Sequence, residues 1–297
     1  MRKGILYAIG AYTIWGFLPI YWKLLQSIPS LELAAHRMVW SFLLVVVVLS
    51  FKGQWQWLKP VLKNKKIMLT FITAGVLVGA NWSIYIWAVN AGFIVETSLG
   101  YFINPLVSVM LGVIFFKERL RLWQGIAVGI AMTGVLYLTV NYGSLPWIAL
   151  SLALTFGFYG LLKKTTRMNA LHGLALEMTV VSLPALVYLF YQESLVGQGA
   201  LGQSGWVTIL LLMGTGVVTA FPLILYTNAV QRIPLSMMGL LFYMTPTMQF
   251  LIGVWVYGEP FTQARMIGFS LVWTALLLYS IEGVIVRRRS VAVQYAN

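Results

Sequence analysis

Ten long apolar segments divide the chain, and short polar links separate them. A helix needs about 20 mostly apolar residues to cross the hydrocarbon core of a bilayer. The segments have about this length and cover residues 4–22, 32–51, 67–88, 95–116, 123–140, 146–162, 171–191, 206–228, 235–257 and 266–285. The pattern therefore predicts an all-α membrane protein with ten transmembrane helices, whose main partner is the lipid bilayer.

The second half of the chain repeats the first at an offset of 141 residues. Chance matches between apolar segments are common at Leu and Val, but they are rare at Gly, Pro, Tyr, Lys and Glu in one frame. The matches include Gly16-Phe17 with Gly157-Phe158, Lys23 with Lys164, Gly75-Val76 with Gly216-Val217, Tyr85 with Tyr226, Pro105 with Pro246, and Glu118 with Glu259.

This offset predicts two five-helix repeats, residues 1–143 and 144–297. Five is an odd number, so the second repeat enters the membrane from the opposite side, and the repeats are inverted. Inverted repeats are the architecture of many secondary transporters, whose substrate sites lie near the bilayer midplane between the repeats.

Composition narrows the chemistry further. The chain is 60% hydrophobic and 9% charged, has no Cys, and has seven acidic residues, all of them Glu. Without Cys and Asp, and with only two His, the chain offers little for a nucleophile or a metal site, so we expect no enzyme activity and no cofactor. A membrane-embedded lipid enzyme is the most distant alternative.

The net charge of +13 is distributed as a topology signal. With the N-terminus in the cytoplasm, all but three of the 20 Lys and Arg residues fall on the cytoplasmic side, Lys163 and Lys164 among them. The exceptions are Lys23 and Arg265 on the far side and Arg37 inside a span. Cytoplasmic loops of membrane proteins are rich in Lys and Arg, so both termini are expected in the cytoplasm of a bacterial inner-membrane protein. Nucleic acid is not an expected partner.

Several stretches resemble the RarD-type permeases of the EamA branch, in the drug/metabolite transporter superfamily. They are residues 11–16 (AYTIWG), 36–41 (HRMVWS), 98–106 (SLGYFINPL), 159–161 (YGL) and 257–259 (YGE). The resemblance extends over nearly the whole chain and implies ten helices, cytoplasmic termini and a small-molecule permease, with export favoured. In that superfamily the first, third, fourth, sixth, eighth and ninth spans line a central cavity, which makes Tyr12, Trp15 and Tyr159 candidate binding residues.

Ionisable residues inside a bilayer are costly and commonly have a function. His36 and Arg37 fall in the first turns of the second span. Arg37 either extends to the outer headgroups or faces an interior cavity. Glu177 occupies the position of His36 in the second repeat, about two turns from the cytoplasmic end. It is either a proton-coupling site or a structural carboxyl group bonded to neighbouring helices.

A set of aromatic and amide side chains recurs in the third, fourth, eighth and ninth spans. It consists of Asn81, Trp82, Tyr85, Tyr101, Asn104, Tyr226 and Tyr243. These side chains would suit a pocket for an amphipathic organic solute; the alternative is that they join helices and anchor interfaces. Pro105 and Pro246 predict matched kinks, needed either for the pathway or for packing alone. Glu118 and Glu259 are interpreted as structural residues at helix ends.

The sequence thus favours a secondary transporter of a small organic metabolite or drug-like solute, working by alternating access. A passive channel or a membrane scaffold subunit is the alternative. Gly125, Gly129 and Gly134 have a spacing that permits close helix packing, and a homodimer through the fifth or tenth span is a further option.

The absence of Cys permits a direct test of the topology. Single Cys residues at Gly143 or Gly197 should react with an impermeant thiol reagent from outside the cell. Cys residues at Asn64 or Ser290 should react only after the membrane is opened. Labelling of the Gly143 position from the cytoplasmic side would contradict the ten-span topology.

Overall fold

The computed structural model describes residues 1–53, 55–91, 93–142, 145–166, 168–258 and 263–296, and these are helical with short connections and no strand. The first half contains α1 (Arg2–Lys23), α2 (Ser30–Phe51), the short α3 (Leu58–Lys63), α4 (Lys65–Asn90), α5 (Ile94–Phe116) and α6 (Leu122–Tyr142). The second contains α7 (Trp147–Thr165), α8 (Ala170–Phe190), the π-helix η1 (Tyr191–Val196), α9 (Ala200–Gln203), α10 (Trp206–Val230), α11 (Leu235–Phe242), α12 (Met244–Tyr257) and α13 (Gln263–Ala296).

Each of the ten predicted spans corresponds to helix in this structure. In the described part of the chain, nine spans are long and apolar enough to cross a bilayer, α11 and α12 together forming one of them. The tenth is α7, which is shorter and has Lys163 and Lys164 in its last turn. The prediction of a ten-helix membrane protein is therefore confirmed.

The ninth span is broken, whereas its counterpart in the first repeat is continuous. Helix α5 passes through Pro105 without interruption. The second repeat turns at Tyr243, between α11 and α12, just before Pro246. Of the two spans in which proline kinks were expected, only the ninth is interrupted. At the break, the Thr245 hydroxyl donates a hydrogen bond to the Tyr12 carbonyl at 3.1 Å, so α1 is joined to the interrupted span.

Glycines at equivalent positions show how the two repeats interlock. A Cβ at Gly16 of α1 would meet Met248 of α12 at 2.8 Å, and one at Gly157 of α7 would meet Val107 of α5 at 2.6 Å. Both the glycines and their partners are 141 residues apart, the repeat offset. The first helix of each repeat thus packs closely against the fourth span of the other.

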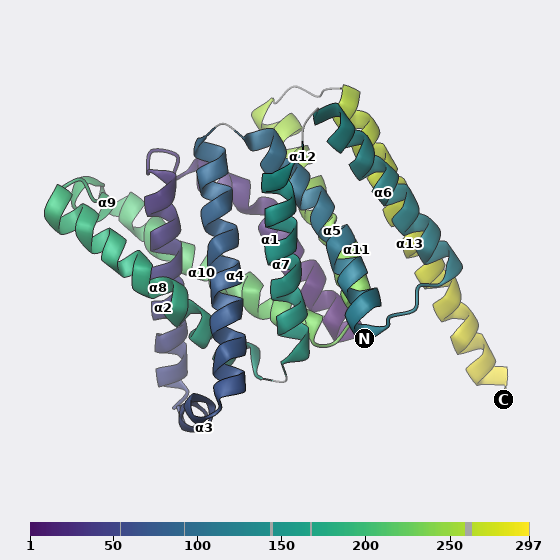
Figure 1. Cartoon of the computed structure of the whole chain (residues 1–297), viewed down its shortest axis with the longest axis horizontal. Coiled ribbons are helices and arrows are strands. Elements are labelled where there is room, and N and C mark those ends of the chain that lie inside the picture. Colours follow the sequence, from purple (N-terminus) through teal and green to yellow (C-terminus); the bar gives the residue numbers. More distant parts are fainter. Residues whose placement is uncertain (54, 92, 143–144, 167, 259–262, 297) are drawn as a thin grey trace.

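The third span of each repeat makes a similar close contact with the second span of the other repeat. A Cβ at Gly75 of α4 would lie 3.0 Å from Val180 of α8, and one at Gly216 of α10 would lie 2.6 Å from the Trp40 backbone of α2. At the outer edge of the bundle, α6 and α13 lie side by side (Figure 1). The contacts between repeats therefore hold the bundle together.

The repeats meet at Phe102 and Tyr243, which are equivalent positions. The Tyr243 hydroxyl donates a hydrogen bond to the Phe102 carbonyl at 3.1 Å, and both side chains are buried. Two equivalent positions that touch must lie near the axis relating the repeats. This axis passes close to the broken ninth span.

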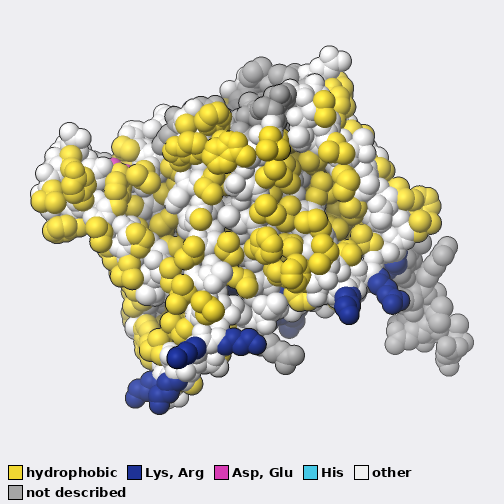
Figure 2. All heavy atoms as spheres, in the orientation of Figure 1, with side chains coloured by type: hydrophobic (Ala, Val, Ile, Leu, Met, Phe, Trp, Pro, Cys, Tyr) yellow, Lys and Arg dark blue, Asp and Glu magenta, His cyan; other side chains and the backbone are white. Residues whose placement is uncertain are grey.

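The surface follows the predicted division between lipid and water. Figure 2 shows hydrophobic side chains over most of the visible face and Lys and Arg along its lower edge. The N-terminus and the end of α13 also lie toward this edge (Figure 1). Lys163 is an exception, because its side chain is only 1% exposed. Lys163 was counted among the charges of the cytoplasmic side, but its side chain points into the bundle and not to the surface. The side chain of Arg265 lies outside the described residues.

The glycine contacts predict a specific loss of stability. Gly216→Ala should lower the free energy of unfolding by about 1–3 kcal/mol, because the new methyl group meets the Trp40 backbone. The measurement is the melting temperature of the purified protein in detergent. Gly125→Ala is the matched control, since nothing lies within 4 Å of its Cβ. Equal melting temperatures for the two variants would show that α10 does not need this close contact.

Candidate functional site

A cavity of about 550 Å³ lies between the two repeats. It opens beside Lys23 and Gln26, both exposed, at the end of α1 remote from the N-terminus. Helices of both repeats contribute its wall. The lining residues are Trp15, Leu18, Pro19, Trp22, Lys23, Gln26, Arg37, Asn81, Trp82, Tyr85, Thr97, Gly100, Tyr101, Asn104, Leu152, Phe156, Thr219, Leu223, Phe242, Thr245 and Gln249.

Arg37 faces this cavity. Its guanidinium carbon lies 4.7 Å from the ring centre of Trp22 and 4.9 Å from that of Trp82. Its Nε donates a hydrogen bond to the Thr219 hydroxyl at 3.2 Å. Of the two interpretations open for Arg37, the interior one agrees with the structure.

Asn81, Tyr85, Tyr101 and Asn104 also line the wall, as expected for a pocket. The Asn81 amide donates to the Leu152 carbonyl at 2.8 Å and to the Thr155 hydroxyl at 2.9 Å, so it also joins α4 to α7. The rings of Tyr85 and Tyr101 meet edge to face, with 5.9 Å between their centres. The side-chain amide oxygen (Oδ1) of Asn104 is buried and has no hydrogen-bond partner among the described residues.

Three other candidates form an aromatic layer beneath the cavity instead of lining it. Tyr12, Tyr159 and Tyr226 are all buried. Tyr226 lies 5.7 Å from Trp15, a lining residue, and stacks on Tyr159 at 6.0 Å. The hydroxyl of Tyr12 donates to the Met238 carbonyl at 3.0 Å. These tyrosines close the floor of the cavity.

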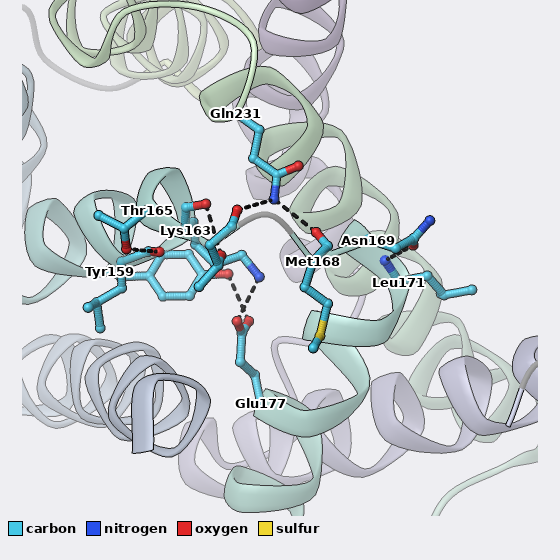
Figure 3. A network of polar contacts seen from close by, with 10 residues as sticks. Tyr159, Lys163, Thr165, Met168, Asn169, Leu171, Glu177 and Gln231 are labelled. Carbon is cyan, nitrogen blue, oxygen red and sulfur yellow. Dashed lines mark hydrogen bonds and ion pairs between the residues drawn. The ribbon is translucent and has the colours of Figure 1, made fainter. Parts of the chain in front are cut away.

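Beneath this floor lies a buried ion pair. The Lys163 ammonium is 2.6 Å from a carboxylate oxygen of Glu177, and the Tyr159 hydroxyl donates to the other oxygen at 3.1 Å (Figure 3). Glu177 is fully buried. Glu177 is therefore bonded to two side chains of the neighbouring helix α7. Lys163 was missed because it was counted with the surface charges, although it lies one helical turn after Tyr159.

A second polar group, which we call the latch, closes the end of the molecule opposite the opening. It consists of Glu118, Lys164 and the start of α11. The Glu118 carboxylate accepts hydrogen bonds from the backbone N–H of Leu235 at 2.7 Å and of Ser236 at 2.9 Å. The Lys164 ammonium donates to the Ile233 carbonyl at 2.6 Å and lies 3.9 Å from Glu118.

Glu118 thus caps α11, in accordance with its interpretation as a helix-end residue. Carboxylates are favourable at helix N-termini, where backbone N–H groups lack partners. Gln231 adds hydrogen bonds to the carbonyls of Thr166 and Met168, both at 3.0 Å (Figure 3). The equivalent residue, Glu259, lies outside the described residues.

His36 and Tyr243 do not line the cavity. His36 is buried in α2, with its Nε2 3.9 Å from Glu32, and this nitrogen has no hydrogen-bond partner among the described residues. Tyr243 lies at the contact between the repeats. The cavity therefore contains Trp15, Arg37, Asn81, Trp82, Tyr85, Tyr101 and Asn104 from the predicted set.

Sequence reasoning also missed polar residues on the second repeat's side of the wall. Thr219, Thr245 and Gln249 lie in spans that are otherwise apolar, and Thr245 and Gln249 are four residues apart on one helix face. The Gln249 amide donates to the Trp15 carbonyl at 3.1 Å. Polar side chains one helical turn apart within an apolar span share a helix face, and this spacing could have identified Thr245 and Gln249 as lining residues from the sequence.

Comparison with known proteins identifies the family. The sequence model of the EamA-like transporter family matches residues 2–140 and again 145–281. The chain is 44% identical to the uncharacterized transporter YojE of Bacillus subtilis, over 97% of both chains. It is 45% identical to Protein RarD of Streptomyces exfoliatus, over 97% of this chain and 91% of that one. The RarD-type resemblance is thereby confirmed.

A solved structure supports the same fold. It is a crystal structure that aligns with a TM-score of 0.72 over 94% of this chain and 97% of its own, at 16% identity, and so bears on the fold alone. Together with the two family matches, the full-length relatives and the helical bundle, it leads to one conclusion: the chain is a multi-pass membrane protein that belongs to the EamA-like transporter family.

Proposed function

We propose that this transporter is a secondary carrier of a small organic solute, and that it works by alternating access. The observation that supports the proposal best is a cavity between the repeats, open at one end and closed at the other by the aromatic floor and the latch. The closing contacts are hydrogen bonds and ring contacts, not covalent links, so the closed end can open. We propose the boundary between the repeats at residues 143 and 144.

The proposed orientation follows from the charged edge of the molecule. We place the Lys- and Arg-rich edge (Figure 2) and both termini in the cytoplasm of a bacterial inner membrane. The opening beside Lys23 then faces outward, and the latch lies on the cytoplasmic side. In this orientation the structure corresponds to an outward-facing state.

The cavity also indicates the size of the cargo. Its volume of about 550 Å³ falls within the usual range for small-molecule pockets, about 300–1,000 Å³. Aromatic rings form much of the wall, with a few amides and hydroxyls between them. A solute with an apolar body and a few polar groups fits this wall.

Proton coupling and dimerisation are separate proposals. Protonation of Glu177 would release Lys163 and loosen the contact between α7 and α8, which offers a means of coupling to protons. The Cβ positions of Gly125 and Gly129 on α6 have nothing within 4 Å, so a second copy has room to approach there.

Breaking the latch should shift the carrier toward its inward-facing state. A Cys at Asn104, in the cavity wall, is labelled with a small impermeant methanethiosulfonate reagent in cells and in inverted vesicles. Glu118→Ala removes the cap of α11, so labelling should rise from the cytoplasmic side and fall from outside, each by roughly tenfold.

Arg119→Gln, an exposed neighbour of Glu118, is the control and should leave both labelling rates unchanged. The experiment also separates a carrier from a channel. In a channel, the opened latch would admit reagent from the cytoplasm without any loss of labelling from outside. This result, or no change at all in a folded variant, would contradict alternating access.

The buried pair can be tested by removing one or both charges. Glu177→Gln leaves the Lys163 ammonium buried without its carboxylate and should destabilise the protein by about 3–5 kcal/mol. The double variant Lys163→Met, Glu177→Gln removes both charges and should recover most of the melting temperature.

The double variant also tests proton coupling. Labelling at Asn104→Cys, normalised to an exposed Cys at Gly197, should depend on pH in the parent and not in the double variant. An unchanged pH profile would assign the Lys163–Glu177 pair to structure alone.

A further inference from the structure

We propose that the cargo of this cavity is an organic acid whose anionic group is bound by Arg37. The inference rests on the proposed function, since it takes the cavity as the cargo site. It adds the charge of the cargo, which neither the family nor the size of the cavity specifies.

The charges around the cavity support this inference. Two cationic side chains, Lys23 at the opening and Arg37 in the wall, line the cavity, and no acidic side chain does so among the residues described. The acids of known placement have other surroundings: Glu32 accepts from the Ala200 N–H, Glu118 is in the latch, Glu177 pairs with Lys163, Glu193 lies in η1, and Glu282 pairs with Arg121. The side chains of Glu96 and Glu259 lie outside the described residues.

The surroundings of the guanidinium group fit a receptor for a planar anion. The Trp22 and Trp82 rings lie within cation–π distance of it, at 4.7 Å and 4.9 Å. A guanidinium group has five N–H donors in its plane. In the described structure only the Nε donor is used, in the bond to Thr219. The Nη groups are therefore available to the two oxygens of a carboxylate, the geometry that Arg favours.

The energetic argument leads to the same ligand. A cation held at the depth of a membrane span is costly unless an anion or several hydrogen bonds compensate for it. Arg37 has one hydrogen bond and no ion pair in the described structure. An acidic cargo would supply the missing charge, and Lys23 at the opening would attract it from outside.

The remaining wall suits the organic part of such an acid. Tyr101 and Phe242 stack with 6.1 Å between their ring centres, one from each repeat. Tyr85 meets Tyr101 edge to face. An aromatic or planar apolar group can pack against these rings while its carboxylate reaches Arg37, so the cavity fits a molecule that is acidic at one end and apolar at the other.

The test uses probes that differ only in charge. Benzoate, phenylacetate and indole-3-acetate are compared with benzamide, phenylacetamide and indole-3-acetamide, and binding to the purified protein is measured by calorimetry. At least one acid should bind about tenfold or more tightly than its own amide, because a hydrogen-bonded charge pair is lost in the amide.

The variants assign this preference to one residue. In Arg37→Gln the preference for the acid should disappear. In Arg37→Lys, which keeps the charge but not the planar donors, it should fall several-fold, and this variant keeps the test valid if Arg37→Gln does not fold. Arg119→Gln removes a charge at the other end of the molecule and should keep the parental preference.

Three results would overturn the proposal: amides that bind as tightly as the acids, a preference for acids that survives in Arg37→Gln, or no binding of any acid to the folded protein. These outcomes are independent of the transport cycle, which the labelling of Asn104→Cys tests without a ligand. Opposite labelling changes without acid binding would indicate a carrier of neutral cargo. Acid binding at Arg37 without those changes would leave an anion site in a protein that does not alternate.

Discussion

Hydrocarbon offers no hydrogen-bond partner, and this constraint organises the polar groups of the protein. Every polar group within a span must find its partner inside the bundle. Two clusters of such groups are the cavity wall around Arg37 and the closed end formed by the Lys163–Glu177 pair and the latch. Between them lies the aromatic floor of Tyr12, Tyr159 and Tyr226, which separates the cavity from the closed end.

Close contacts between glycines and the opposite repeat allow helices of the two repeats to pack tightly around the cavity. Gly16 and Gly157 allow the first helix of each repeat to approach the fourth span of the other, where a side chain would push the helices apart. Dispersion and close packing, not the hydrophobic effect, hold helices together in lipid, so small residues at the crossings contribute directly to association. The same crossings bring residues of both repeats, such as Tyr101 and Phe242, to one cavity wall.

The features that depend on local composition could be predicted from the sequence. Apolar length located all ten spans, and matches at Gly, Pro and Lys revealed the repeats. Features that depend on the rotation of a helix about its axis could not. Lys163 was counted as a surface charge, since only packing against α8 shows that its side chain turns inward to Glu177. Tyr12, Tyr159 and Tyr226 lie in cavity-forming helices, yet their rings point below the cavity, because depth and rotation are set by the opposite repeat.

The contact between Tyr243 and Phe102 has a consequence for the resting state. Two identical halves that exchanged their conformations would give two end states of equal energy. Here the tyrosine hydroxyl bonds to the Phe102 carbonyl in the observed state. With the conformations exchanged, Phe102 would occupy the place of Tyr243 and would have no hydroxyl to donate. A single hydrogen bond contributes about 0.5–1.5 kcal/mol, so in the alternating-access cycle proposed above this one difference would bias the populations of the two states by up to about tenfold. Two similar but unequal repeats in one chain thus permit what a symmetric dimer of identical chains cannot have, different energies for the two exchanged conformations.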